Sequence, residues 1–194
     1  MWTDAVRQVD AGGGPRPDLG AANDDVGFVP HPLLRAGEAQ TLAGLCWPRP
    51  WPPGGERLLI PCPPGHLTAR WHHAAAGRGP RGLTVVLLHG LGGSSASPYV
   101  RGAARKLLDA GLDVVRLNLR GCGDSATLSP TVYHAGSSDD IAATLRHLRT
   151  LGCGRLALWG FSLGGNLALK LAGEAGASAE RPAGVVALSP LTDL

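Results

Sequence analysis

The sequence predicts an α/β fold, in which a mostly parallel sheet carries helices on both faces. From residue 83 onward, short apolar runs of strand length alternate with longer segments of helical apolar period. The run Leu83–Leu88 (LTVVLL) is apolar and β-branched without polar alternation, which is typical of a strand buried on both faces. Such alternation implies right-handed crossovers, so we expect ligands to bind at the carboxyl ends of the strands.

Local signals justify each expected element in order. Two short strands precede residue 83 and are separated by Pro63-Pro64-Gly65. Ser97 is expected to cap one helix, and Ser137 with Asp140 has the spacing of a capping box for the next. The expected strands are 57–61, 67–72, 83–88, 113–119, 155–159 and 184–188, and the expected helices are 98–110, 138–151 and 163–171.

Composition narrows the class of protein. A chain of 194 residues suits one domain with a sizeable core. Apolar residues make up 44% and charged residues 17%, and the longest apolar run is about half a membrane span, so we expect no transmembrane segment. The net charge is only +3 and the arginines are scattered, which argues against nucleic-acid binding.

The spacing of the four cysteines and the composition of the N-terminal segment indicate which cofactors and which cellular compartment to expect. The cysteines are far apart and lack metal-like spacing to histidine, so we expect free thiols and no metal or other cofactor. No secretory signal opens the chain, so a cytoplasmic location is expected. Residues 1–27 are Gly/Pro-rich and are expected to form a flexible tail, residues 28–55 an irregular arm, and residues 56–194 the α/β domain.

The strongest functional signal is the stretch 160–165 (GFSLGG), which places Gly-x-Ser-x-Gly between an expected strand and an expected helix. A serine on such a sharp turn projects its hydroxyl from the end of the sheet, and the flanking glycines leave space for the turn. The helix N-terminus behind it favours developing negative charge. Ser162 is therefore the predicted nucleophile.

The stretch 89–93 (HGLGG) follows an earlier strand and predicts an oxyanion-binding loop. Acyl transfer needs two backbone N–H donors aimed at the oxyanion, and we expect Leu91 and Leu163 to supply them. His89 is expected to order this turn or to line the pocket rather than to act as a base.

Four segments together resemble the α/β-hydrolase superfamily, and more narrowly the AB hydrolase 4 group of YheT-like esterases. They are HGLGGSSASPYVR (89–101), NLRGCGDS (118–125), YHAGSSDD (133–140) and GFSLGGNLALKLAGE (160–174). One departure is Glu38, where that group usually has histidine. The resemblance implies the α/β-hydrolase fold and a carboxylic-ester hydrolase with Ser162 as charge-relay nucleophile. It implies small-molecule substrates, namely short- or medium-chain acyl esters or lipid esters, and no identifiable partner protein.

The rest of a catalytic triad is not expected within this sequence. In this fold the acid and then the histidine follow the serine along the chain, but all seven histidines precede Ser162. Asp193 lies before the usual position of the acid, and His134 is better explained as a loop-ordering or pocket-lining residue. We therefore expect a chain truncated at its C-terminus that lacks the last strands, and doubtful activity for the chain alone.

Two alternatives remain open at this stage. A dinucleotide-binding oxidoreductase is suggested by Gly121-x-Gly123-x-x-Ala126, although Ser129-Pro130 should prevent the helix that would receive a pyrophosphate. A catalytically inactive hydrolase-fold fragment or binding protein is suggested by the missing histidine.

Overall fold

The computed structural model describes residues 29–46, 54–75, 82–176, 178 and 180–191. The chain divides into two compact units, residues 1–44 and residues 45–194. The expected tail, 1–27, lies outside the described residues, as do residues 47–53 of the expected arm. Within that arm the structure forms a helix, α1 (Gly37–Cys46), where we expected irregular chain. Its alanine, leucine and glutamine residues favour a helix, but the surrounding prolines dominated the sequence pattern.

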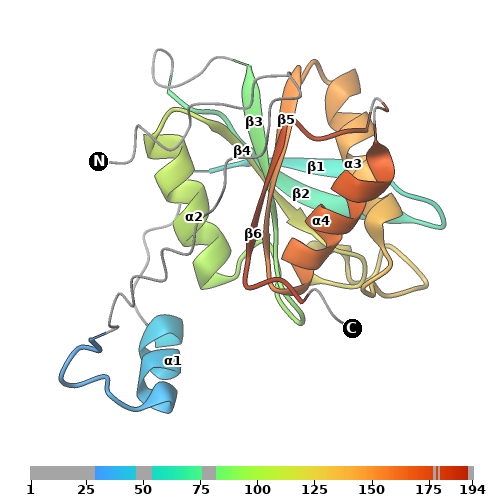
Figure 1. The fold of residues 1–194 in the computed structure, drawn as a ribbon. Helices are drawn as coiled ribbons and strands as arrows, with labels where there is room; N and C mark the ends of the chain where they lie inside the picture. The colour runs from blue at the N-terminus through green and yellow to red at the C-terminus, as the bar shows by residue number, and fades with distance from the viewer. Residues whose placement is uncertain (1–28, 47–53, 76–81, 177, 179, 192–194) are drawn as a thin grey trace, which may run out of the picture. The chain divides into compact units, whose positions relative to one another are not determined.

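The second unit is built on a six-stranded sheet in the order β1-β2-β4-β3-β5-β6 (Figure 1). Strands β4, β3, β5 and β6 run parallel, while β2 is antiparallel to both β1 and β4, so the expected mostly parallel sheet is confirmed. The strands are β1 (Glu56–Pro61), β2 (His66–His72), β3 (Leu83–Leu88), β4 (Asp113–Asn118), β5 (Arg155–Phe161) and β6 (Gly184–Leu188). The helices are α2 (Pro98–Asp109), α3 (Ser138–Thr150) and α4 (Leu163–Ala175), with a short 3-10 turn, η1 (Gly123–Ser125).

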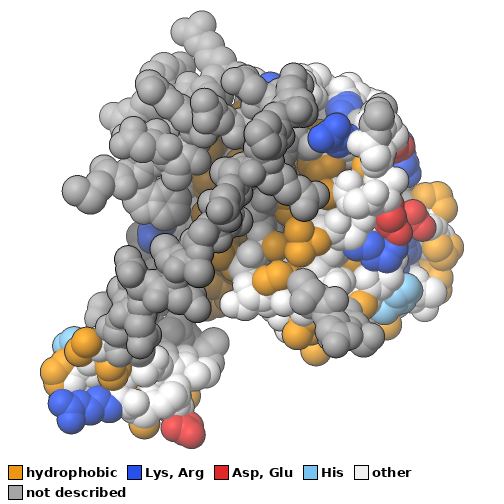
Figure 2. Space-filling model, in the orientation of Figure 1, with side chains coloured by type: hydrophobic (Ala, Val, Ile, Leu, Met, Phe, Trp, Pro, Cys, Tyr) orange, Lys and Arg blue, Asp and Glu red, His pale blue; other side chains and the backbone are white. Residues whose placement is uncertain are grey.

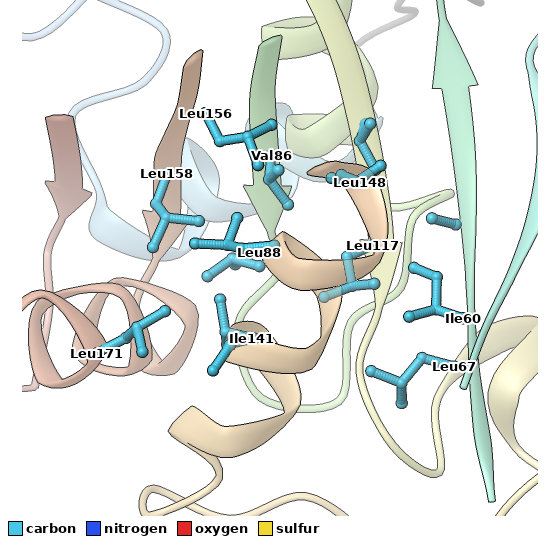
Figure 3. Close-up of a cluster of buried hydrophobic side chains, with 14 of the residues drawn as sticks. Ile60, Leu67, Val86, Leu88, Leu117, Ile141, Leu148, Leu156, Leu158 and Leu171 are labelled. Carbon is cyan, nitrogen blue, oxygen red and sulfur yellow. The ribbon is translucent and has the colours of Figure 1, made fainter. Parts of the chain in front are cut away.

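Helices cover both faces of this sheet, as expected. Helix α2 packs on one face against β3 and β4, and α3 and α4 pack on the other (Figure 1). The central strand β3 serves both sides, since Val85 and Leu87 belong to the cluster under α2 while Val86 and Leu88 belong to the larger cluster under α3 and α4. Figure 3 shows this larger cluster, in which side chains from the strands β1 to β5 lie around Ile141 and Leu148 of α3. Burial on both faces explains the apolar run that predicted this strand.

The prediction that side chains cap α2 and α3 is wrong. Ser97 and Ser137 do occupy the two N-cap positions, but neither side chain bonds to its helix. Ser97 Oγ accepts the N–H of Ser94 (2.9 Å), and Ser137 Oγ accepts the N–H of His134 (3.0 Å). Both hydroxyls therefore stabilise the loop before the helix, because serine can satisfy a nearby loop N–H as readily as a helix N–H.

Strand β6 is the edge of the described sheet beyond β5. Val186 is 45% exposed and Leu188 is 42% exposed, although both lie on a strand of apolar sequence. Hydrophobic side chains also reach the surface of this unit in the space-filling view (Figure 2). None of the helices in the described segments is both long and apolar enough to cross a lipid bilayer.

Candidate active site

Ser162 lies in the sharp turn that joins β5 to α4, as the sequence predicted. It is the N-cap residue of α4 and has φ 50° and ψ −120°, a sparsely populated conformation that costs a non-glycine residue about 1–3 kcal/mol. The backbone is held on both sides, since Ser162 N–H donates to Leu188 O (2.9 Å) and Asn166 N–H donates to Ser162 O (3.0 Å). Strain that the surroundings enforce in this way is typical of functional positions.

The Ser162 side chain does not cap its own helix. An N-cap serine usually accepts an N–H from the first helical turn, and that bond would occupy both the hydroxyl and a donor. Here the hydroxyl stays out of the first turn, at the positive end of the α4 dipole. Leu163, whose N–H is a predicted oxyanion donor, is the first residue of that helix.

The two glycines of the motif are required by close backbone contacts. A Cβ atom on Gly160 would lie 2.2 Å from the carbonyl oxygen of Gly164, and a Cβ on Gly164 would lie 2.5 Å from the carbonyl oxygen of His89. These contacts are with backbone atoms, which cannot rotate away as a side chain would. The spacing Gly-x-Ser-x-Gly therefore lets the turn close and brings α4 against the end of β3.

The loop that follows β3 lies against Ser162. A Cβ on Gly90 would be 3.2 Å from Ser162 Cβ, so this loop and the serine are in van der Waals contact. Gly93 N–H donates to Gly90 O (3.1 Å) and Gly92 has φ 66°, which is the pattern of a type II turn. Leu91 lies at the tip of this turn, and its residue surface is 80% exposed.

His89 is fully buried and orders this loop. Its Nε2 accepts the N–H of Leu119 (3.1 Å), so the proton is on Nδ1, which donates to Gly90 O (2.8 Å). Burial lowers the pKa of His89, and the bond to Gly90 offsets part of that effect. Both ring nitrogens are occupied by the backbone, so this ring has no free nitrogen for proton transfer.

The other residues proposed from the sequence do not meet at Ser162. His134 is exposed, and its Nδ1 accepts the N–H of Gly136 (3.0 Å) within its own loop. Asp193 lies outside the described residues. In the part of the chain that the structure describes, Ser162 Oγ has no hydrogen bond to a histidine or a carboxylate. That part also contains no cluster of histidine, cysteine and acidic side chains that could hold a metal ion.

Sequence reasoning missed a buried ion pair that holds the neighbouring loop. Arg120 bonds both carboxylate oxygens of Asp140, with Nε–Oδ2 3.0 Å and Nη2–Oδ1 2.5 Å. Arg120 also donates to Ser129 Oγ (2.8 Å) and to Cys62 O (3.2 Å), and the Cys62 thiol donates to Asp140 (3.0 Å). Asp140, expected in a capping box, instead pairs with Arg120, two residues after the end of β4. Capping-box spacing alone could not reveal this partner.

Two tyrosines that sequence reasoning gave no role also contact the loop beside Ser162. Tyr99 Oη accepts the N–H of Gly90 (3.1 Å), and Tyr133 Oη accepts the N–H of Gly92 (2.8 Å). Tyr133 was part of a motif that carried the family resemblance, but no local pattern connects it with a loop about 40 residues earlier.

The geometry after β4 does not suit a dinucleotide. Gly121 precedes η1, a single 3-10 turn that begins at Gly123, and no α-helix starts there. A pyrophosphate would therefore lack the helix N-terminus that this class of site uses. The alternative of a dinucleotide-binding oxidoreductase loses its structural basis here.

Several curated proteins similar to this chain have the name of an esterase or a lipase. The putative esterase YheT of Escherichia coli K12 is 34% identical over 107 residues, which are 55% of this chain and 32% of that protein. The monoacylglycerol lipase of Saccharomyces cerevisiae is 33% identical over 92 residues, which are 46% of this chain and 20% of that protein. The chain thus spans a third or less of the length of these relatives.

Solved structures and a family model agree with this similarity. A serine hydrolase without a lid from Xanthomonas campestris has a TM-score of 0.61 and 27% identity, covering 73% of this chain and 64% of that one. An alpha-beta serine hydrolase homologue from Coxiella burnetii has a TM-score of 0.60 and 25% identity, covering 73% and 65%. The model of the alpha/beta hydrolase fold matches residues 84–194, more than half of this chain. The chain therefore belongs to the alpha/beta hydrolase fold family.

Proposed function

We propose that this chain carries the nucleophile and the oxyanion-binding groups of a serine esterase. The observation that supports this most directly is the conformation of Ser162, which is strained, does not cap α4, and lies in contact with the loop at Gly90. A structural serine at a helix N-terminus would gain stability from a cap bond and an unstrained φ. Ser162 has neither the cap bond nor an unstrained φ, and its hydroxyl lies at the carboxyl end of β5.

In the proposed reaction, Ser162 Oγ attacks the ester carbonyl carbon and loses its proton to a general base. The N–H groups of Leu91 and Leu163 stabilise the oxyanion of the tetrahedral intermediate. The intermediate collapses, the alcohol leaves with the proton that the base returns, and a water molecule then hydrolyses the acyl-serine. We assign no base, because His89 has both nitrogens occupied and no histidine follows Ser162 in this sequence.

The proposed substrates are carboxylic esters with short or medium acyl chains, or lipid esters. The segments next to the serine carry apolar and aromatic side chains, namely exposed Leu91 in the turn 90–93 and the edge-to-face pair of Tyr99 and Phe161 with ring centroids 4.9 Å apart. The names of two similar proteins, a monoacylglycerol lipase and a phospholipase, also refer to lipid esters. The described cysteines are free thiols, which fits a reducing compartment, and we propose the cytoplasm.

Hydrolysis of p-nitrophenyl butyrate tests this proposal with three proteins. They are this chain, a chimera that continues it with the C-terminal part of the E. coli relative, since in this fold the acid and the histidine follow the serine, and that chimera with Ser162→Ala. We expect kcat of the chimera to exceed that of the other two by on the order of 10⁴. Ser178→Ala in the chimera is the matched control, since Ser178 is exposed outside the site, and it should retain kcat within about twofold.

The activities of these proteins distinguish a serine esterase from a non-catalytic protein. If the chimera loses its activity with Ser162→Ala but keeps it with Ser178→Ala, the result supports Ser162 as the nucleophile. An active chimera that tolerates Ser162→Ala would contradict it. A chimera that folds but has no activity even with Ser162 present would favour a catalytically inactive hydrolase-fold protein. The absence of a histidine after Ser162 in this sequence also suggests that alternative.

A further inference from the structure

We infer that Tyr99 and Tyr133 are positioning residues of the oxyanion loop, and that their hydroxyls leave the N–H of Leu91 as the one free donor of its turn. This inference rests on the proposed function and extends it to two residues that do not touch the reacting atoms. They are the only two tyrosines in the sequence, and both hydroxyls bond to the same four-residue turn.

A count of the N–H groups in the turn 90–93 leads to this inference. Gly90 N–H donates to Tyr99 Oη (3.1 Å), Gly92 N–H donates to Tyr133 Oη (2.8 Å), and Gly93 N–H closes the turn on Gly90 O (3.1 Å). The remaining N–H, that of Leu91, has no acceptor among the described residues. Because Leu91 is exposed, this N–H is open to solvent, and in the turn beside Ser162 it is the donor that a developing oxyanion can accept from.

The two hydroxyls reach the turn from different elements, so together they restrict its movement. Tyr99 is in the first turn of α2, and its ring packs edge-on against Phe161, the residue before Ser162. Tyr133 lies in the loop before α3, and its own N–H donates to Arg120 O (3.1 Å). Arg120 is in turn held by the buried pair with Asp140. The oxyanion loop is thus fixed to α2 on one side and to the loop after β4 on the other.

The carbonyl side of Gly90 is fixed as well. Gly90 O accepts from His89 Nδ1 (2.8 Å) and from Gly93 N–H, and Tyr133 Oη lies at the long distance of 3.5 Å. A rotation of the peptide between Gly90 and Leu91 would break these bonds. The two hydroxyls therefore act on the orientation of the Leu91 N–H without contacting substrate. Preorganised donors of this kind lose catalytic effect when they are free to reorient.

Tyr133→Phe and Tyr99→Phe test the inference because each removes one hydroxyl and keeps the ring. Amide hydrogen exchange, measured on this chain by NMR, should accelerate about tenfold or more at Gly92 in Tyr133→Phe and at Gly90 in Tyr99→Phe. In the active chimera, each variant should lower kcat about 3- to 10-fold, the factor that corresponds to one lost hydrogen bond, with KM within about twofold. The affinity for an alkylboronic acid, which mimics the tetrahedral intermediate, should fall by the same factor as kcat.

Thr131→Val is the control, since its exposed hydroxyl lies in the same loop as Tyr133 and bonds to Ser129 instead of to the turn. It should leave exchange at Gly92 and kcat unchanged. Unchanged exchange at Gly92 in Tyr133→Phe would overturn the inference, and so would accelerated exchange with an unaltered kcat. If both Phe variants are fully active in a chimera that Ser162→Ala inactivates, the inference fails while the proposed function stands. A chimera that tolerates Ser162→Ala refutes the proposed function whatever the tyrosine variants show.

Discussion

Replacing Arg120 by methionine should destabilise the fold far more than replacing an exposed arginine. The side chains of Arg120 and Asp140 are only 7% and 8% exposed, and two hydrogen bonds join them. Arg120→Met leaves the buried carboxylate with the Cys62 thiol as its remaining donor. Removing one partner of such a pair costs about 3–5 kcal/mol, which corresponds to a fall in Tm of roughly 6–20 °C for a unit of this size.

Urea denaturation followed by circular dichroism measures this change in the free energy of unfolding. Arg105→Met is the matched control, because Arg105 also bonds an aspartate, Asp109, through Nε, but that pair is 43% and 60% exposed. Its loss should cost about 0.5 kcal/mol or less. The double variant Arg120→Met with Asp140→Leu should cost less than the sum of the single variants, since no buried charge is left unpaired. A cost below about 1 kcal/mol for Arg120→Met would refute the reasoning.

Three further predictions concern single residues. Ser162→Gly should raise the free energy of unfolding by about 0.5–1 kcal/mol in urea titrations, because glycine adopts φ 50° without strain; a loss of stability would contradict the strained turn. Burial is the main cause that lowers the pKa of His89, so as the pH falls the unfolded chain binds the proton of this histidine before the folded chain does. The free energy of unfolding should therefore fall as the pH drops below about 6.5. This pH dependence should be weaker in His89→Gln and unchanged in the exposed control His134→Gln. Burial raises the pKa of Cys62 to about 12, so alkylation by iodoacetamide at pH 8, followed by mass spectrometry, should modify Cys62 only after unfolding; rapid labelling of the native chain would oppose this.

From residue 83 onward, the sequence alone was enough to predict the order of the strands and helices. The strand Leu83–Leu88 has the bounds that its apolar run predicted, because a strand buried on both faces needs apolar side chains at every position. Ser162 likewise lies in the turn that its flanking glycines predicted. Both features depend on chemistry within a few residues, which a linear pattern records.

The hydrogen-bond partners of the polar side chains, by contrast, depend on contacts between distant parts of the chain. Ser97, Ser137 and Asp140 carried signals for helix caps, yet the two serines bond to loop N–H groups and Asp140 pairs with Arg120 across the fold. Capping propensity is worth about 1 kcal/mol, so a competing partner of similar or greater strength redirects the side chain.

The same limit applies to the candidate site. The sequence placed Leu91 in a glycine-rich loop, but only the fold brings Tyr99 and Tyr133, from separate elements, onto the N–H groups on either side of it. Sheet order brings β4, and the loop that leads to Tyr133, next to β3, and that order depends on strand pairing over long separations in the chain. The nucleophile could be found from local sequence because its turn is local, whereas the orientation of the oxyanion donor follows from contacts that no local pattern contains.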